Sequence, residues 1–401
     1  MNLKAGYPFW LIKDGLPFNY PALSQHVKTD VVVMGGGISG ALAAWQLINS
    51  GIDCIVVDAR SIGLGSSCAS TSLLQYEIDT PLSSLQNKVG LQHAVRSYHL
   101  CRQSITALGD IAKEIKFKDF EYKQSLYYAA YKKDIPFLKK EFNIRKQHGF
   151  KVELLDSDAV KKTFDFSAPA AMLSKDGAQT NAYQFAHHLL QAGIEKGLKV
   201  YDRTNIIHIN HQPKQVVLTT EKNYSITSKK MVYATGYEAG KYIRKPIVKL
   251  LSTFATISEY METGRPFWNK DVLIWNTADP YLYMRTTKDN RILVGGRDED
   301  FYNPSRRDKL IVTKAKQLSK DFKKLFPQLP FKSEFNWAGT FGSTKDGLPF
   351  IGRYKPLSNS YFSLGFGGNG ITFSQVAANI ICDLVLGKPN KDATIFSFDR
   401  V

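Results

Sequence analysis

Short apolar runs alternate with amphipathic stretches along this chain, and the first two runs enclose a glycine-rich turn. Val31-Val32-Val33-Met34 is continuously apolar, as expected of a strand buried on both faces. Residues 38–50 follow with a helical pattern that ends at Gly51. Residues 54–58 predict a second buried strand that ends at Asp58. The order strand, helix, strand predicts a βαβ unit.

Helical and strand-like patterns continue to the C-terminus. Helices are predicted at residues 80–116, 135–148, 182–196 and 371–386. Strands are predicted at residues 125–130, 198–200, 231–235, 282–285 and 291–296, and the region 250–335 has several strand-like segments. This alternation predicts an α/β fold.

Residues 1–28 are rich in proline and aromatic side chains, beginning with Tyr7-Pro8-Phe9-Trp10. They predict an irregular N-terminal arm that packs on the body of the protein through its rings. A cover over an active site is the alternative interpretation, since functional residues are frequent on such segments.

Composition and charge narrow the possible functions. The 401 residues are 43% hydrophobic, 12% aromatic and 22% charged, which is typical of a soluble globular protein of about two domains. No repeat is visible, which argues against solenoids and propellers. The net charge of +17 is spread along the chain, which favours a basic surface over a nucleic-acid site. Attraction for an anionic substrate or a membrane surface stays open.

The cysteines and histidines show no metal-binding spacing. Four cysteines are scattered without a CxxC pair, which favours a reduced, cytoplasmic protein, and no HExxH occurs among the eight histidines. The longest apolar stretch, Val31–Trp45, is interrupted by glycines and is too short for a bilayer. Neither a signal peptide nor a transmembrane segment is expected.

The turn Gly35-Gly36-Gly37-Ile38-Ser39-Gly40 satisfies GxGxxG directly after a strand and at the start of a helix. Gly35 permits the tight turn, Gly37 lets the backbone approach a pyrophosphate, and Gly40 lets helix and strand pack closely. The helix N-terminus offers free N–H groups and a positive dipole end to the phosphates. The turn therefore predicts a dinucleotide site.

Two further features identify the dinucleotide as FAD. Asp58 ends the second strand, 18 residues past Gly40, where it suits both ribose hydroxyls and repels a 2′-phosphate. The loop 365–370 is a second glycine-rich helix start, far from the first. A flavin that accepts a hydride develops negative charge at its N1–O2 edge, which N–H groups at a helix N-terminus would stabilise.

The order of these motifs resembles the D-amino-acid-oxidase-type (DAO) FAD-dependent oxidoreductases over nearly the whole chain. In layout the chain is most similar to the gamma-glutamylputrescine oxidoreductase branch of that family. The motifs that carry the resemblance are residues 30–40, Asp58-Ala59-Arg60 with Gly63, Gly65, Ser66 and Ser67, Val232–Gly236, Asp346–Gly352 and Gly367–Thr372.

The resemblance implies a Rossmann-like FAD-binding domain interleaved with a mixed-sheet (α+β) substrate domain. The FAD domain would use residues 1–80, 181–240 and 336–401, and the substrate domain 81–180 and 241–335. Together the motifs and the resemblance assign these residues to the cofactor: Gly35, Gly37, Ile38, Ser39, Gly40, Asp58, Ala59, Arg60, Gly65, Ser66, Ser67, Ile206, Ala234, Thr235, Gly236, Gly367, Gly368, Asn369, Gly370, Ile371 and Thr372.

The segment before Asp346 departs from this family in two ways. Phe341 stands where the amino-acid oxidases carry the arginine that holds a substrate carboxylate. The segment also lacks the cysteine through which sarcosine-oxidase-like relatives attach their flavin, so FAD is expected to be non-covalent. Cys68 is the alternative attachment point, although a small buried thiol is the interpretation we prefer.

The resemblance implies oxidation of a C–N bond in an amine or amino-acid derivative by hydride transfer to flavin N5. Tyr283 and Arg285 are the substrate-side candidates, because they share one face of a predicted strand. The guanidinium of Arg285 would bind the substrate anion in place of the arginine missing at Phe341. A half-buried sheet tyrosine and a surface ion pair are the competing interpretations of these two residues.

Three alternatives in function stay open at this point. A dehydrogenase of the same fold would rest on the membrane and pass electrons to quinone, where an oxidase would use oxygen. A tRNA-modifying flavoprotein would use the basic charge, although no nucleic-acid partner is expected from its distribution. A flavin-binding protein without catalysis is disfavoured by the glycines retained at both ends.

Overall fold

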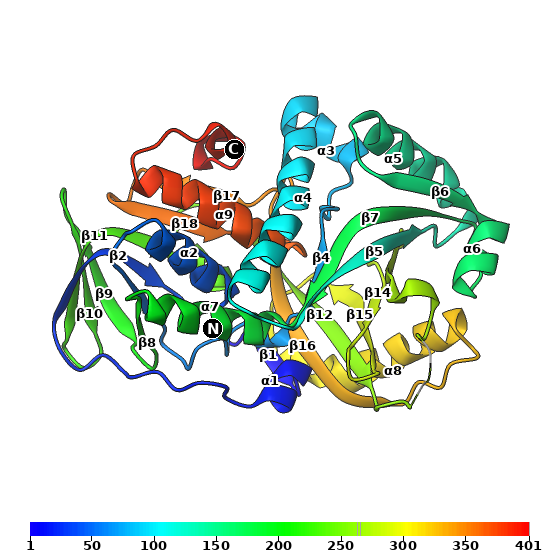
Figure 1. Ribbon diagram of the computed structural model, residues 1–401, viewed down its shortest axis with the longest axis horizontal. Coiled ribbons are helices and arrows are strands. Elements are labelled where there is room, and N and C mark those ends of the chain that lie inside the picture. The colour runs from blue at the N-terminus through cyan, green and yellow to red at the C-terminus, as the bar shows by residue number, and fades with distance from the viewer. Residues whose placement is uncertain (263, 265, 401) are drawn as a thin grey trace.

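The structure is a computed structural model that describes residues 1–262, 264 and 266–400. Among these residues the strands form two mixed sheets, one of eight strands and one of ten, with helices packed on both (Figure 1). The predicted α/β fold is confirmed. The glycine-rich turn belongs to the eight-stranded sheet, and the strand of Tyr283 belongs to the ten-stranded sheet.

The eight-stranded sheet has the order β17-β18-β11-β2-β3-β8, with β10 paired to β11 and β9 to β10. Its strands are β2 (Val27–Met34), β3 (Cys54–Val57), β8 (Lys199–Tyr201), β9 (Ile206–His211), β10 (Val216–Thr220), β11 (Ser225–Tyr233), β17 (Phe350–Arg353) and β18 (Ser360–Leu364). β2 pairs in parallel with β3 and β11. Both faces of β2 are covered: Val31 and Val33 pack in the core with the helices, and Val32 and Met34 in a second cluster on the opposite face. This explains the uninterrupted apolar run.

The ten-stranded sheet has the order β1-β16-β12-β15-β14-β13-β5-β7-β4, and β6 pairs with β7. Its strands are β1 (Lys4–Gly6), β4 (Leu73–Gln75), β5 (Phe120–Tyr128), β6 (Val152–Asp156), β7 (Ala170–Thr180), β12 (Lys249–Ser258), β13 (Leu273–Asn276), β14 (Tyr283–Thr286), β15 (Ile292–Glu299) and β16 (Ser333–Ser343).

The helices pack on these sheets and on one another. They are α1 (Phe9–Asp14), α2 (Ile38–Asn49), α3 (Leu82–Val89), α4 (Leu91–Glu114), α5 (Ile135–Gln147), α6 (Ser157–Phe164), α7 (Ala182–Glu195), α8 (Pro304–Leu325) and α9 (Gly370–Val385). α2 contacts both α7 and α9 beside the eight-stranded sheet, and α4 contacts α9 (Figure 1). In the described part of the chain, none of these helices combines the length and the apolar character needed to cross a membrane.

The division into two domains stays a prediction, although the strands separate largely as it requires. β1, β4 and most of β16 are exceptions, because they lie in the ten-stranded sheet while the prediction counts residues 1–80 and 336–401 with the FAD domain. Conversely, the prediction counts α4 with the substrate domain, but Tyr98 and Leu108 of α4 are buried in the same core as residues of α2 and α9.

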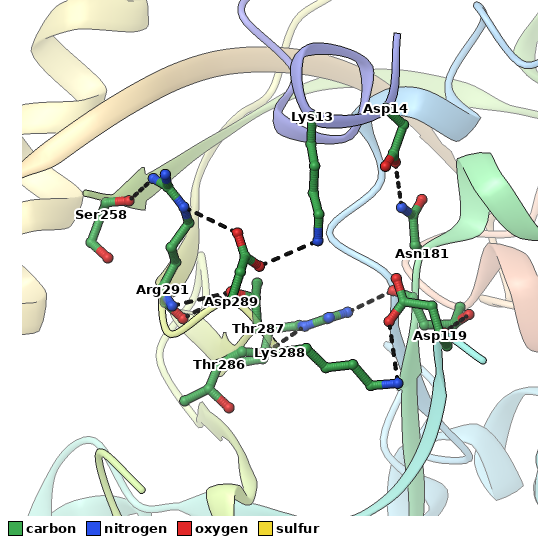
Figure 2. A network of polar contacts seen from close by, with 12 residues as sticks. Lys13, Asp14, Asp119, Asn181, Ser258, Thr286, Thr287, Lys288, Asp289 and Arg291 are labelled. Atoms are coloured by element: carbon green, nitrogen blue, oxygen red, sulfur yellow. Dashed lines mark hydrogen bonds and ion pairs between the residues drawn. The ribbon is translucent and has the colours of Figure 1, made fainter. Parts of the chain in front are cut away.

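The N-terminal arm is more ordered than the sequence predicts. It contains β1, which pairs antiparallel with β16, and α1, in which Phe9 and Trp10 are buried. Figure 2 shows Lys13 directed at Asp289 (Nζ to Oδ1 3.4 Å) and the Asn181 amide donating to Asp14 (2.6 Å). Packing through aromatic rings is confirmed. The expectation of an irregular arm holds for residues 15–26 but is wrong for residues 4–6 and 9–14, where the edge of β16 supplies a hydrogen-bonding partner for β1 and α1 follows.

The elements predicted individually match the structure within a few residues, but others were not predicted, among them β6, α6, β7, β9, β10 and the long helix α8. Residues 304–325, within a region predicted as strand-rich, form the 22-residue helix α8. Asn303 caps it by accepting from the Arg306 N–H, and Pro304 begins it. α8 packs Leu318 and Phe322 on the ten-stranded sheet.

Candidate functional site: a cavity lined by both sheets

A cavity of about 500 Å³ is lined by residues of both sheets. The eight-stranded sheet contributes the glycine-rich turn after β2 and the end of β3. The ten-stranded sheet contributes residues of β12, β14, β15 and β16, and the start of α9 adds residues 367–371. The carboxyl ends of β2, β3 and β11 meet at this cavity, which is where ligands bind in open parallel sheets.

Steric contacts explain why these three positions of the turn are occupied by glycine. Gly35 has φ 114°, and a Cβ there would lie 2.4 Å from the Ala234 carbonyl oxygen. A Cβ on Gly40 would lie 1.8 Å from the Gly35 carbonyl oxygen, and one on Gly37 would lie 2.9 Å from Ser67 Oγ. The turn is therefore tight, the start of α2 packs directly on it, and the backbone at Gly37 is open to the cavity.

Asp58 ties the end of β3 to the glycine-rich turn. Its carboxylate accepts from the Gly36 N–H (2.7 Å) and from the Arg60 N–H (2.8 Å), and it lines the cavity. Burial raises the pKa of Asp58, which these two hydrogen bonds partly offset. A carboxylate has about four acceptor positions, so its oxygens keep capacity for ribose hydroxyls.

Buried polar atoms along this end of the cavity test whether a dinucleotide fits. Arg60 Nε, Ser66 Oγ and Thr235 Oγ1 are buried and have no hydrogen-bond partner among the described residues. All three side chains line the cavity. Unsatisfied buried polar atoms are uncommon in native proteins, and a bound polar ligand is one way to satisfy them. The residues fit the adenosine and phosphate groups of FAD.

Most of the residues predicted for the cofactor line this one cavity. They are Gly35, Gly37, Ile38, Ser39, Asp58, Ala59, Arg60, Gly65, Ser66, Ser67, Ile206, Ala234, Thr235, Gly236, Gly367, Gly368, Asn369, Gly370 and Ile371. Gly40 and Thr372 lie outside the lining. Gly40 packs beneath the turn, and the buried Thr372 hydroxyl donates to the Asn369 carbonyl. Their contribution is to the shape of the two helix starts.

The second glycine-rich segment is held by contacts that the sequence did not indicate. The Gly368 N–H donates to Asp79 Oδ2 (2.6 Å), and the Asn369 amide donates to the Gln75 and Glu77 carbonyls. Gly367 has φ 60°. These contacts place the segment after β4 against the N-terminus of α9, where the flavin ring is expected.

Tyr283 and Arg285 share one face of β14 but have different surroundings. Tyr283 lines the cavity. Arg285 is 2% exposed and lies outside the lining. Its guanidinium donates to the carbonyls of Thr71, Ser72 and Thr180. This position does not favour the role that we predicted for Arg285, because the donors that these bonds use hold the protein backbone, and the role stays a prediction.

The end of the cavity beside β14 and β15 is aromatic and acidic. Trp275, Tyr281 and Tyr283 line it together with Asp79 and Asp298. The Tyr281 hydroxyl donates to Asp79 Oδ1 (3.3 Å). Burial raises the pKa of Asp79 above its ordinary value and raises the pKa of Asp298 to about 7, with the Asp79 charge adding to the second shift.

Sequence reasoning missed Asp79, Asp298 and Tyr281. A usable signal existed for Tyr281, because it shares the period-two face of Tyr283. Asp298 is an acidic residue that follows the apolar run of β15. Asp79 had no local signal, since only the packing of its loop on α9 brings it to the site.

The four cysteines are free and buried. Cys68 lies outside the cavity lining, and its thiol donates to the Gly65 carbonyl at a Sγ to O distance of 3.4 Å. Burial raises the pKa of this thiol to about 11, so it is protonated at neutral pH. Within the described ranges, no group of three or more His, Cys, Asp or Glu side chains is arranged to hold a metal ion.

Comparison with known proteins identifies the family to which this protein belongs. The family model of the FAD-dependent oxidoreductases (DAO) matches residues 30–384. The chain belongs to this family. This DAO-family member is therefore an FAD-dependent oxidoreductase, and the glycine-rich turn and the segment 367–371 are at opposite ends of the region that the model matches.

The similarity to known proteins extends over nearly the whole chain. Gamma-glutamylputrescine oxidoreductase of Escherichia coli is 25% identical over 385 residues, which cover 92% of this chain and 86% of that protein. Glycine oxidase of Geobacillus kaustophilus superposes with a TM-score of 0.77 at 19% identity, covering 92% of this chain and 98% of that one. L-proline dehydrogenase of P. horikoshii superposes with a TM-score of 0.77 at 18% identity, covering 93% of this chain and 97% of that one. These two solved structures share the fold of this chain.

Proposed function

We propose that this protein oxidises a C–N bond of an amine or amino-acid derivative, with non-covalent FAD as hydride acceptor. The observation that carries the proposal is one continuous cavity from the glycine-rich turn to the aromatic end beside β14 and β15. A dinucleotide-type turn at one end and aromatic side chains at the other end of a single cavity suit direct hydride transfer. The names of the similar proteins, an amine oxidoreductase, a glycine oxidase and a proline dehydrogenase, agree with it.

The chain supplies binding, orientation and exclusion of water. When bound, FAD supplies the hydride acceptor at flavin N5. The backbone at Gly37 and the N-terminus of α2 would face the pyrophosphate, and Asp58 the ribose. Residues Gly367–Ile371 would face the flavin ring, and Tyr283 would border the substrate. The substrate gives up a hydride from carbon as its nitrogen lone pair forms the C=N bond, and water then hydrolyses that imine.

Non-covalent attachment is supported by the cysteines. Cys68 is the cysteine next to the lining residues Ser67 and Ala69, yet its neutral thiol is directed at the Gly65 carbonyl. Precipitation of the protein with acid should release all the flavin into the supernatant. Flavin that stays with the precipitate would show a covalent bond.

The test of the activity is anaerobic bleaching of the bound flavin across amines, N-methyl amino acids and 2-hydroxy acids. We expect bleaching with at least one amine or amino-acid derivative and none with the hydroxy acids. Bleaching by hydroxy acids alone would overturn the proposal. Stopped-flow reoxidation of the reduced flavin by oxygen and by a soluble quinone then assigns the protein as an oxidase or a dehydrogenase.

A further inference from the structure

We infer that the β14–β15 end of the cavity selects an aliphatic amine that carries a second, protonated nitrogen and no carboxylate, with Asp79 and Asp298 binding that cation. The inference rests on the proposed amine oxidation and narrows its substrate class. It depends on the charges, the aromatic rings and the unpartnered oxygens at this end of the cavity.

Charge separates the two ends of the cavity. Among the described lining residues the basic side chains are Arg60 and Lys241, and both pair with Glu238, with N to O distances of 2.8 and 3.5 Å. The side chains that line the β14–β15 end include Asp79 and Asp298 and, from the described chain, no lysine, arginine or histidine. A carboxylate substrate would therefore meet charges of its own sign there.

The two positions considered for binding a substrate carboxylate do not present a cation to the cavity. Phe341 lines the cavity where related amino-acid oxidases were expected to carry an arginine. Arg285 uses its guanidinium on the carbonyls of Thr71, Ser72 and Thr180. Neither residue offers a cation to the cavity, so this end has carboxylates for a cation and, among the described lining residues, no cationic side chain for an anion.

Aromatic rings frame the two carboxylates. The ring of Trp275 lies 6.2 Å from that of Tyr281, whose ring lies 5.7 Å from that of Tyr283. Faces of tryptophan and tyrosine attract alkylammonium groups, and their apolar surface suits the methylenes between two nitrogens. The combination of carboxylates and aromatic rings is suited to an organic cation.

Carboxylate oxygens without donors supply an independent observation. Asp298 Oδ1 is buried and has no hydrogen-bond partner among the described residues. Glu77, 4% exposed, also lines the cavity and has an unpartnered Oε2, while its Oε1 lies 3.6 Å from the buried Arg145 guanidinium. A buried carboxylate oxygen without a donor is costly, and an ammonium in the cavity would supply a donor to Asp298 Oδ1 together with the opposite charge. The raised pKa of Asp298 has the same cause.

The test uses three substrates of equal chain length that differ at one end. Anaerobic reduction of the flavin is followed with 1,4-diaminobutane, n-butylamine and 4-aminobutanoate. We expect half-saturation at a concentration about tenfold lower for the diamine than for n-butylamine, because one charge-assisted hydrogen bond is worth about that factor. The amino acid should be the poorest of the three. Equal half-saturation for diamine and monoamine, or preference for 4-aminobutanoate, would overturn the cation site while leaving amine oxidation in place.

Variants test whether Asp298 causes the preference for the diamine over n-butylamine. Asp298→Asn should raise the half-saturation for the diamine about tenfold and leave that for n-butylamine within about twofold. Asp300→Asn is the matched control, because Asp300 is two residues away, 66% exposed, and paired with Lys249. The Asp298→Asn substitution removes the charge of a partly buried carboxylate whose Oδ1 has no hydrogen-bond partner among the described residues, so the variant should fold, which retained flavin and an unchanged or higher Tm would verify. An unchanged diamine preference in Asp298→Asn would refute the assignment.

Calorimetry separates failure of the inference from failure of the proposed function. If no amine bleaches the flavin, the proposed function fails, and binding of 1,4-diaminobutane to the FAD-bound protein is measured directly. Binding that is lost in Asp298→Asn and kept in Asp300→Asn would support the cation site on its own. Absence of binding would overturn the site as well.

Discussion

Asp58 is the residue that we propose connects the backbone turn to the nucleotide. Because its carboxylate accepts from two backbone N–H groups, it orders the turn as well as offering acceptors to a ribose. Asp58→Ala should raise the Kd for FAD by at least about tenfold, the value of one charge-assisted hydrogen bond. Fluorescence titration of the apoprotein with FAD measures this change. Asp53→Asn, at an exposed position before β3, should bind FAD as the unmodified protein does.

Gly40 is a residue whose role is steric. A Cβ at this position would lie 1.8 Å from the Gly35 carbonyl oxygen, so Gly40→Ala must displace the start of α2 from the turn. We expect a loss of about 1–3 kcal/mol or more in the free energy of unfolding, together with weaker FAD binding. Gly240→Ala is the control, because a Cβ there meets nothing within 4 Å. Equal stability of the two variants in denaturant unfolding would contradict the steric role.

At the scale of elements, α1 connects the N-terminal arm to the wall of the cavity. Trp10 is 1% exposed, its Nε1 donates to the Ser70 carbonyl (2.7 Å), and its ring lies 5.3 Å from the Arg285 guanidinium. Ser70 lines the cavity. Trp10→Ala should reduce the free energy of unfolding by about 3–5 kcal/mol. Ile12→Ala, on the same helix at a side chain that is 48% exposed, should change it by less than about 0.5 kcal/mol. Similar unfolding midpoints for both variants would refute this role of α1.

At the scale of the whole molecule, the cavity that both sheets line brings acidic groups together. The pKa of Asp298 is raised from its ordinary value of 3.8 to about 7, so the folded protein holds this proton more tightly than the unfolded chain does. Its contribution to the free energy of unfolding therefore falls as pH rises from about 4 to about 7. Asp298→Asn should become increasingly more stable than the unmodified protein over this range, by at least about 2 °C in Tm at pH 8.

Thermal unfolding of both proteins at pH 5 and pH 8 measures that difference. The comparison between proteins cancels the titration of the other carboxylates, whose pKa values shift in both directions. Asp300→Asn should show no such pH-dependent difference. A Tm difference that shrinks as pH rises would contradict burial of Asp298 as the cause.

The local sequence pattern was sufficient to predict the strand, turn and helix at the glycine-rich end of the site. A strand buried on both faces must be apolar throughout, a turn residue whose Cβ would lie 2.4 Å from a carbonyl oxygen must be glycine, and a helix that begins there follows from its own periodicity. These constraints act within residues 30–58 and are visible in a linear sequence. α8 was missed although Asn303 and Pro304 mark its start, because the surrounding strands dominated the pattern of residues 250–335.

The sequence by itself therefore determined the fold class and the glycine-rich turn, and it predicted most of the residues that line the cavity around that turn. The tertiary structure decided what lies at the other end of the cavity. Asp79, Tyr281 and Asp298 come from separate segments, and only pairing within the ten-stranded sheet and packing on α9 bring them together. The strand period placed Arg285 on the face of Tyr283, but the depth at which β14 is buried directs its guanidinium to backbone carbonyls. Alternation specifies a face, whereas the groups that meet at that face depend on long-range packing.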